Sequence, residues 1–466
     1  MKNKLLLILG VCLLTLSTFA QAKEQSLHDK MLEFRATEAL VWAMPMLNFK
    51  HIRDGMEAVG VKRGDIAYNS KMQDWKFQVA TANNTTPYIT FFYNIENGPM
   101  VIEIPASANG VGIFGTIMDA WERPIDDVGA AGRDKGRGAK YVILPENYQG
   151  PLLPNAYTYT QRTNNGIVIL RPIIADDSPE NLAKAAAFAK KIKVYPLSEA
   201  SSPKPNRYVD VYGKVIEATP DIDVSTYKKL DEMVQEENIE AQNLAMMGLL
   251  AQIGIKKGMP FNPSPELKKI YAKAAPQAHQ YMIEEYHRYL NQTMYKGTKW
   301  KKLVPPGVIE TDFSYEFPNF FDYVARGPIY YAIISSVKNY GSATFYVETA
   351  ETEDGQWLDG SKNYELVVPA NVPVKDFWAV TTYDLDTAAY QRDIAKSSID
   401  SNQKALKTNK DGTVTIYFGP KAPKGKASNW LPTVKGRNFF LLFRFYGPTK
   451  KTYDGSWKLD SIKLVK

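Results

Sequence analysis

The side chains best suited to chemistry in this sequence are aromatic, amide and guanidinium groups at or near the ends of predicted strands. One set lies in the last third of the chain and comprises Trp378, Tyr383, Asn429, Trp430 and Arg444. A second set lies nearer the amino terminus and comprises Asn83, Tyr88, Asp119, Trp121 and Arg171. Trp and Tyr offer flat faces to sugars and other ring compounds, and Arg offers a planar fork to carboxylate or sulfate. We therefore expect a small-molecule or glycan ligand in a cleft between the two halves of the protein.

Other kinds of site find less support, and the catalytic residues stay unknown. The sequence has no Gly-x-Ser-x-Gly elbow, and the Gly-rich loop at 129–138 lacks the Gly-Lys-Ser/Thr ending of a phosphate cradle. His28, His51, His279 and His287 do not have zinc-ligand spacing, so we predict no metal site of this kind and no cofactor. A calcium site bound by turn carboxylates stays open, and its candidate ligands are Asp354, Asp359, Asp384 and Asp386.

The elements that must position these residues are mainly strands. Alternating apolar runs cut by Gly and Pro predict strands at 87–95, 98–106, 110–121, 139–145 and 164–174, and a second strand-rich region from about 343 to 465. Helical spacing predicts a helix over 27–49 that Pro45 ends, another from Ser178 to about Lys193, and helices between Val224 and Tyr295. We expect Pro276 to kink or split the last of these. The pattern is that of β-sandwiches with a helical segment between them.

The residues at the amino terminus have the pattern of a signal peptide, which predicts that the protein is exported. Lys2 and Lys4 precede an apolar stretch, and Ala20-Gln21-Ala22 fits a signal-peptidase site, so we predict cleavage after Ala22 and a periplasmic or secreted protein without stable membrane insertion. The single cysteine, Cys12, lies within this signal, which makes the mature chain disulfide-free. The formal net charge of +7 belongs to scattered lysines, and we therefore expect no nucleic-acid partner. A homo-oligomer stays open.

The last third of the chain resembles the domain of unknown function 1214. The residues that carry this resemblance are Asp354-Gly355, Leu358-Asp359-Gly360-Ser361, Asn363-Tyr364, Phe377-Trp378, Thr382-Tyr383-Asp384, Asp411-Gly412, Asn429-Trp430-Leu431-Pro432 and Arg444-Phe445-Tyr446-Gly447-Pro448. The amino-terminal β region resembles the domain of unknown function 1254 through Asn83, Thr86, Tyr88, Gly98-Pro99, Pro105, Asp119, Tyr141, Gly150, Arg171, Gly254-Ile255, Gly258 and Phe261. The commoner pattern of that family has an acid where Thr85 stands here.

These resemblances imply an immunoglobulin-like β-sandwich, a helical middle segment and a carboxy-terminal jelly-roll-like β-sandwich, and they supply no activity. The corresponding division is a signal peptide at 1–22, an amino-terminal domain at 23–200, a helical segment at 201–300 and a carboxy-terminal domain at 301–466. The leading functional hypothesis is an exported protein that binds a small polar or cyclic ligand, including glycan fragments. The alternatives are a periplasmic hydrolase or isomerase with a site drawn from both sandwiches, and a structural or interaction protein.

Overall fold

The amino-terminal half of the protein is built on two facing sheets. The computed structural model of the protein describes residues 26–220, 222–290, 292–305, 307–333, 337–341 and 343–465, so the predicted signal and Cys12 lie outside the described residues. The larger sheet contains, in spatial order, β11 (Tyr208–Asp210), β1 (Ile66–Tyr68), β3 (Ile89–Asn94), β9 (Asn165–Ile173), β5 (Gly112–Asp119) and β6 (Pro124–Gly129). The smaller sheet contains β10 (Lys193–Pro196), β4 (Met100–Ile104), β7 (Ala139–Pro145) and β8 (Tyr157–Gln161).

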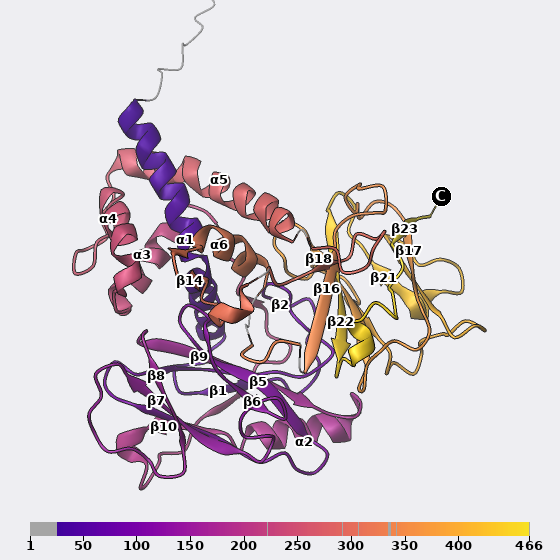
Figure 1. The fold of residues 1–466 in the computed structure, drawn as a ribbon, viewed down its shortest axis with the longest axis horizontal. Helices are drawn as coiled ribbons and strands as arrows, with labels where there is room; N and C mark the ends of the chain where they lie inside the picture. Colours follow the sequence, from indigo (N-terminus) through magenta and orange to yellow (C-terminus); the bar gives the residue numbers. More distant parts are fainter. Residues whose placement is uncertain are drawn as a thin grey trace, which may run out of the picture.

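The carboxy-terminal half repeats this arrangement with its own pair of sheets (Figure 1). One sheet contains β13 (Lys301–Lys302), β16 (Thr344–Thr349), β22 (Phe439–Tyr446), β18 (Trp378–Asp384) and β19 (Ser398–Asp400). The other contains β21 (Trp430–Pro432), β20 (Val414–Gly419), β17 (Tyr364–Val368) and β23 (Lys463–Leu464). Two small ribbons pair β2 (Phe77–Gln78) with β12 (Ile216–Glu217) and β14 (Glu316–Phe317) with β15 (Phe320–Phe321).

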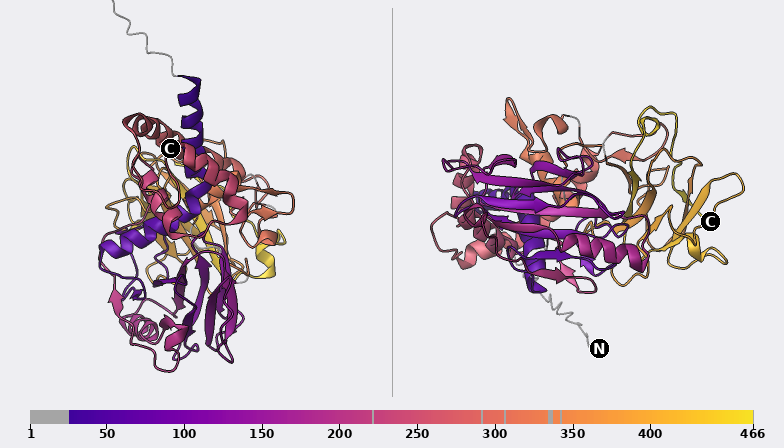
Figure 2. Two further views of the ribbon diagram at one scale, coloured as in Figure 1. Left: turned by 90° about the vertical axis from the view of Figure 1, so that its left-hand side faces the viewer. Right: turned by 90° about the horizontal axis from the view of Figure 1, so that it is seen from below.

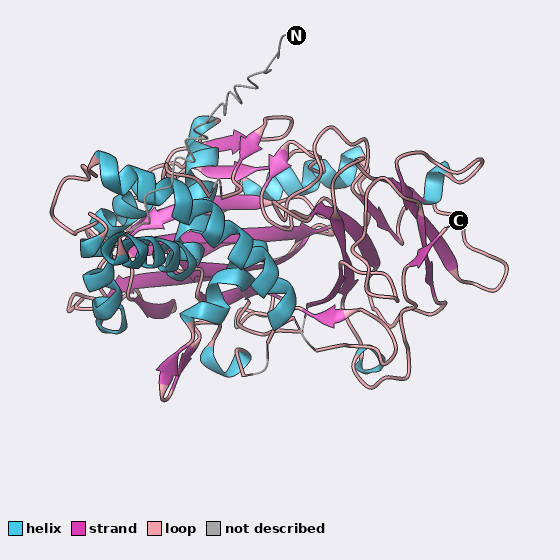
Figure 3. Ribbon diagram, turned by 90° about the horizontal axis from the view of Figure 1, so that it is seen from above, coloured by secondary structure: helices cyan, strands magenta, loops and turns pink. Residues whose placement is uncertain are grey.

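Helices from three separate stretches of the chain form one layer beside these sheets (Figures 1 and 3). The layer contains α1 (Leu27–Ala58), α3 (Thr226–Glu236), α4 (Leu244–Gln252), α5 (Pro265–Tyr289) and α6 (Tyr323–Ala332), while α2 (Pro179–Ala189) lies apart on the amino-terminal half. Short 3-10 turns occur at Leu197–Glu199, Ala241–Asn243, Ile309–Thr311, Ala427–Asn429 and Lys450–Thr452. None of the helices in the described part of the chain is both long and apolar enough to cross a bilayer.

A single hydrophobic core joins the helices to both halves. It includes Ile169 of β9, Leu442 of β22 and Trp42 of α1, while separate cores fill each pair of sheets. The views in Figure 2 show the carboxy-terminal strands lying beside the amino-terminal ones, with the helices against both. The expected β-rich fold with a helical part is thus confirmed, and the single cysteine of the sequence agrees with a disulfide-free protein.

Proline positions account for the main errors in the helix predictions. Helix α1 does not end at Pro45 but runs on to Ala58, and α6 packs closely against the turn before this proline. A Cβ on Gly327 would lie 2.3 Å from the Val41 carbonyl, and Arg326 Nη2 donates to the Trp42 carbonyl at 3.0 Å. Helix α5 continues through Pro276 as one element, so the helix is not split there.

The strand predictions hold more closely. Each of the five runs predicted between 87 and 174 contains a strand, namely β3, β4, β5, β7 and β9. Strands β6 and β8 were not predicted, since Pro124-Ile125-Asp126-Asp127 reads as a polar turn and Tyr157-Thr158-Tyr159-Thr160 lacks an apolar face. Ser178 caps α2 as expected, accepting from the Asn181 backbone N–H at 3.4 Å.

Candidate functional site

Two buried arginines face each other across the junction of the two halves because of strand alternation. On β9, Val168 and Leu170 fill the core between the amino-terminal sheets, so Arg171 points out of the opposite face with Ile169. On β22, Phe443 and Phe445 fill the carboxy-terminal core, so Arg444 points out with Leu442. Both outward faces border the shared core, and both guanidinium groups line one pocket there.

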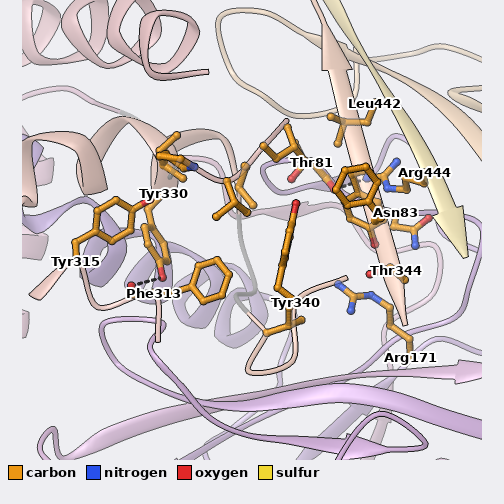
Figure 4. A pocket seen from close by; sticks show the side chains of 18 of the residues that line it. Thr81, Asn83, Arg171, Phe313, Tyr315, Tyr330, Tyr340, Thr344, Leu442 and Arg444 are labelled. Carbon is orange, nitrogen blue, oxygen red and sulfur yellow. Dashed lines mark hydrogen bonds between the residues drawn. The ribbon is translucent and has the colours of Figure 1, made fainter. Parts of the chain in front are cut away.

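The pocket is mostly apolar. The space not filled by atoms within it is about 890 Å³, part of which is open to solvent. In Figure 4, Arg171, Arg444 and Asn83 stand at one end, Tyr315 and Tyr330 stand at the other, and Tyr340 lies between them. The described apolar and aromatic lining residues include Leu303, Phe313, Tyr315, Ile329, Tyr330, Ile333, Tyr340, Phe345, Tyr346 and Leu442.

Arg171 is buried with little to neutralise it. Its side chain is largely inaccessible, at 8% relative exposure, and Nε donates to the Tyr88 hydroxyl at 2.8 Å. The guanidinium also lies 5.1 Å from the Tyr88 ring centre and 5.4 Å from that of Phe114. Among the described residues, no Asp or Glu forms an ion pair with Arg171. A buried cation without a counterion is costly, and such a group is a natural receptor for an anionic ligand.

Arg444 instead holds the two halves together. It donates to Thr381 Oγ1 at 2.7 Å, to the Thr81 carbonyl at 3.0 Å and to the Tyr383 hydroxyl. The Tyr383 hydroxyl in turn donates to the Ala82 carbonyl. Arg444 therefore fixes Thr81 and Ala82 of the amino-terminal half against the carboxy-terminal sheet, although it too lacks an acidic partner among the described residues.

Hydroxyl and amide groups complete the polar end of the pocket. Asn83 Nδ2 donates to the Tyr446 hydroxyl at 2.8 Å, and Thr85 Oγ1 lies 3.0 Å from the same hydroxyl. Thr85 Oγ1 also donates to Asn83 Oδ1 at 2.7 Å. Position 85, where the commoner family pattern has an acid, thus lies in the same hydrogen-bonded group as a pocket residue and here carries no charge.

The tyrosines near Arg171 and Arg444 do not neutralise the positive charge of these arginines. Burial raises the pKa of Tyr383 to about 12, although Arg444 acts in the opposite direction. Burial also raises the pKa of Tyr446 and of Tyr340. These phenols stay protonated near pH 7, so the polar end of the pocket keeps the positive charge of Arg171 and Arg444.

Four of the residues predicted from the sequence line the pocket, namely Asn83, Tyr88, Arg171 and Arg444. A fifth, Tyr383, accepts a hydrogen bond from Arg444. Trp378 lies in the carboxy-terminal core, with its ring stacked 5.5 Å from Phe443. Asn429 donates to the Lys407 and Thr415 carbonyls, and Trp430 Nε1 donates to the Gly419 carbonyl, so both secure turns away from the pocket.

Asp119 and Trp121 do not line the pocket. They lie in the amino-terminal half near α1 and α6. Asp119 accepts from Arg123 Nε at 2.6 Å, within a charged group that also contains Glu240. Trp121 meets Trp42 edge to face, with 5.0 Å between ring centres, and lies under the Arg326 guanidinium. These contacts give both residues a packing role at the helix–sheet boundary.

Sequence reasoning did not assign the aromatic wall of the pocket. Phe313, Tyr315, Tyr330 and Tyr340 all fall between 313 and 346, a stretch whose aromatic density is plain in the sequence. That density is the signal that could have found them. Phe313 and Tyr315 lie in an irregular segment, Tyr330 in α6 and Tyr340 in the segment at 337–341, and only the tertiary fold makes them converge.

The residues considered for metal binding are dispersed. Within the described ranges, no group of three or more His, Cys, Asp or Glu side chains is arranged to hold a metal ion. His279 Nε2 lies 2.8 Å from the Tyr331 hydroxyl, and His287 lies beside Glu348. Asp384 pairs with Arg437, whose Nε donates at 2.7 Å.

Comparisons with known proteins agree with the two halves. Residues 66–196 match the family described as "Protein of unknown function (DUF1254)", and residues 343–450 match "Protein of unknown function (DUF1214)". A search of curated proteins gave no significant match.

Two solved structures are similar in fold. The VPA0106 protein from Vibrio parahaemolyticus is 17% identical with a TM-score of 0.54, over 94% of this chain and 100% of that one. An uncharacterized protein from Burkholderia cenocepacia is 12% identical with a TM-score of 0.42, over 94% of this chain and 95% of that one. The first of these supports a shared fold along nearly the whole chain.

Proposed function

The chain belongs to the proteins in which a DUF1254 domain is followed by a DUF1214 domain, and we propose that it is an exported protein that binds a small cyclic organic anion at the junction of the two halves. The observation that carries this proposal is the buried Arg171, which lines a mostly apolar pocket without an ion-pair partner among the described residues. Ring acids, including acidic glycan fragments, satisfy both the charge and the aromatic wall.

Binding is favoured over catalysis by the composition of the pocket wall. The described lining residues include no Asp, Glu or His, which are the usual general acids and bases. A hydrolase or isomerase remains the second candidate. Incubating each bound compound with the protein and analysing it by mass spectrometry separates the two, because a binding protein returns the compound unchanged.

A ligand panel tests the proposal directly. Titration calorimetry of the mature protein with benzoate, phenylacetate, galacturonate and shikimate, and with their uncharged amides or parent alcohols, should detect binding only by acids. The control R133M removes an equally charged but exposed arginine that lies over Tyr157 on the amino-terminal half, and it should leave binding unchanged. Equal binding of acids and uncharged analogues, or no binding by any compound, overturns the proposal.

The proposal includes export of the protein from the cytoplasm, with cleavage of its signal peptide. Cleavage after Ala22 would make Lys23 the first residue of the protein recovered from the periplasm or medium, which amino-terminal sequencing checks.

We also propose that the amino-terminal half is a variant of an immunoglobulin-like sandwich and the carboxy-terminal half a variant of a jelly-roll-like sandwich. The facing sheets with separate cores support this.

A further inference from the structure

A second cavity lies against the polar end of the junction pocket. The space not filled by atoms within it is about 430 Å³, part of which is open to solvent, and it is smaller than the junction pocket. The walls of both cavities include Thr81, Asn83, Tyr88 and Arg171. These four residues therefore mark a boundary with a hydrogen-bonding and cationic group between two hollow spaces.

The second cavity is apolar away from that boundary. Its far wall comes from α1, β2, β3, β9 and the segment that follows β2, through Ile52, Phe77, Val79, Ala80, Ala82, Thr90 and Ile169. All of these residues are buried, and Thr90 alone among them has a polar side chain. A small alkyl group fits this space, whereas a charged or strongly hydrated group does not.

Resting on the proposed function, we propose that the ligand is a carboxylic acid with two apolar substituents on the carbon beside its carboxylate. The carboxylate meets Arg171 at the boundary, where Tyr88 orients the guanidinium through the 2.8 Å bond to Nε. The ring occupies the larger cavity beside Phe313 and Tyr340, and a short alkyl chain enters the smaller one. A branched acid uses both cavities, and a single-armed acid leaves the smaller one unfilled.

The two arms differ in size and enter different walls, which makes recognition stereospecific. In one enantiomer of a 2-arylalkanoic acid, the ring and the alkyl chain match the larger and smaller cavities. In the other enantiomer the two are exchanged, and the ring must enter the smaller of the two cavities. Enantiomer preference therefore reports on the second cavity and not on the charge of Arg171.

The test compares phenylacetate with the separate enantiomers of 2-phenylpropanoate and 2-phenylbutanoate by titration calorimetry. Each added carbon on the favoured enantiomer should tighten binding about fourfold, the fold-change for one buried methylene group. The variants A80L and T90I narrow the second cavity alone. They should lower the affinity for 2-phenylbutanoate to that for phenylacetate and leave phenylacetate itself unchanged. Using two variants guards against the failure of one to fold.

The outcomes separate this inference from the proposed function. Binding of phenylacetate with no gain from the alkyl group, or an equal gain for both enantiomers, overturns the two-armed ligand and leaves the anion site standing. A gain that persists in both A80L and T90I also overturns it. Absence of binding by all three acids overturns the proposed function together with this inference.

Discussion

Replacing Arg171 by methionine separates a ligand-binding cation from a structural one. Methionine keeps much of the side-chain volume and removes the charge, the hydrogen bond to Tyr88 and the cost of burying a cation. In the ligand-free protein we expect the thermal midpoint of R171M to be unchanged or higher. Breaking a buried structural ion pair would instead cost about 3–5 kcal/mol.

The same substitution should abolish most of the binding. A charge-assisted hydrogen-bonded contact contributes about 1.5–3 kcal/mol, which corresponds to about a 10- to 150-fold rise in Kd. At a ligand concentration about 100 times the wild-type Kd, the ligand stabilises the wild-type protein by about 2.7 kcal/mol. A variant that binds about 100-fold more weakly retains about 0.4 kcal/mol of that stabilisation.

The assay is a pair of melting curves with and without a ring acid from the panel, supported by calorimetric titration. The control R133M changes the net charge equally and should behave as wild type in both measurements. A large loss of stability in ligand-free R171M, or an unchanged Kd, would refute the assignment of Arg171 as the anion receptor.

Three further outcomes follow from the contacts around the pocket. R444M should lower the free energy of unfolding by about 2–4 kcal/mol, since it leaves the Thr81 carbonyl without its 3.0 Å donor; urea denaturation checks this, and a neutral effect would contradict the anchoring role. T85D places a carboxylate beside the Tyr446 hydroxyl and should weaken acid binding at least about tenfold, while T85N should stay within about threefold; equal affinities in calorimetry would sink this reasoning. Burial, reinforced by Lys229 and Lys50, lowers the pKa of His51 to about 3. The unfolded chain therefore binds more protons between about pH 6.5 and 3, and the stability of the folded protein decreases as the pH is lowered through this range, by up to about 1.4 kcal/mol per pH unit. The stability difference between H51Q and wild type should shift in favour of H51Q as pH falls from 7 to 5, and a constant difference in urea denaturation would argue against a neutral buried His51.

The sequence predicts the β framework because strand alternation is a local signal. The apolar run of β9 shows where a strand lies, and its period of two residues then decides that Arg171 leaves the face opposite Leu170. The helix boundaries are harder to predict from the sequence. Pro45 ends a helix by local rules, but α1 continues through it and packs there against Gly327 and Arg326 of α6, a tertiary contact that local rules do not include.

Part of the candidate site could also be predicted from the sequence, because strand alternation is a local signal. Asn83, Tyr88, Arg171 and Arg444 combine side-chain chemistry with strand ends, and they meet at the pocket. Trp378 has the same chemistry but points to the other face of its strand, into the core with Phe443. Part of the aromatic wall, Phe313, Tyr315 and Tyr340, comes from irregular segments, whose side-chain directions no periodicity predicts.

The most direct test of the central claim is a crystal structure of the mature protein with a bound ring acid. We expect the carboxylate within hydrogen-bond distance, about 2.7–2.9 Å, of the Arg171 guanidinium, with the ring beside Phe313 and Tyr340. A ligand seated elsewhere, or an acid whose carboxylate turns away from Arg171 toward solvent, would contradict it.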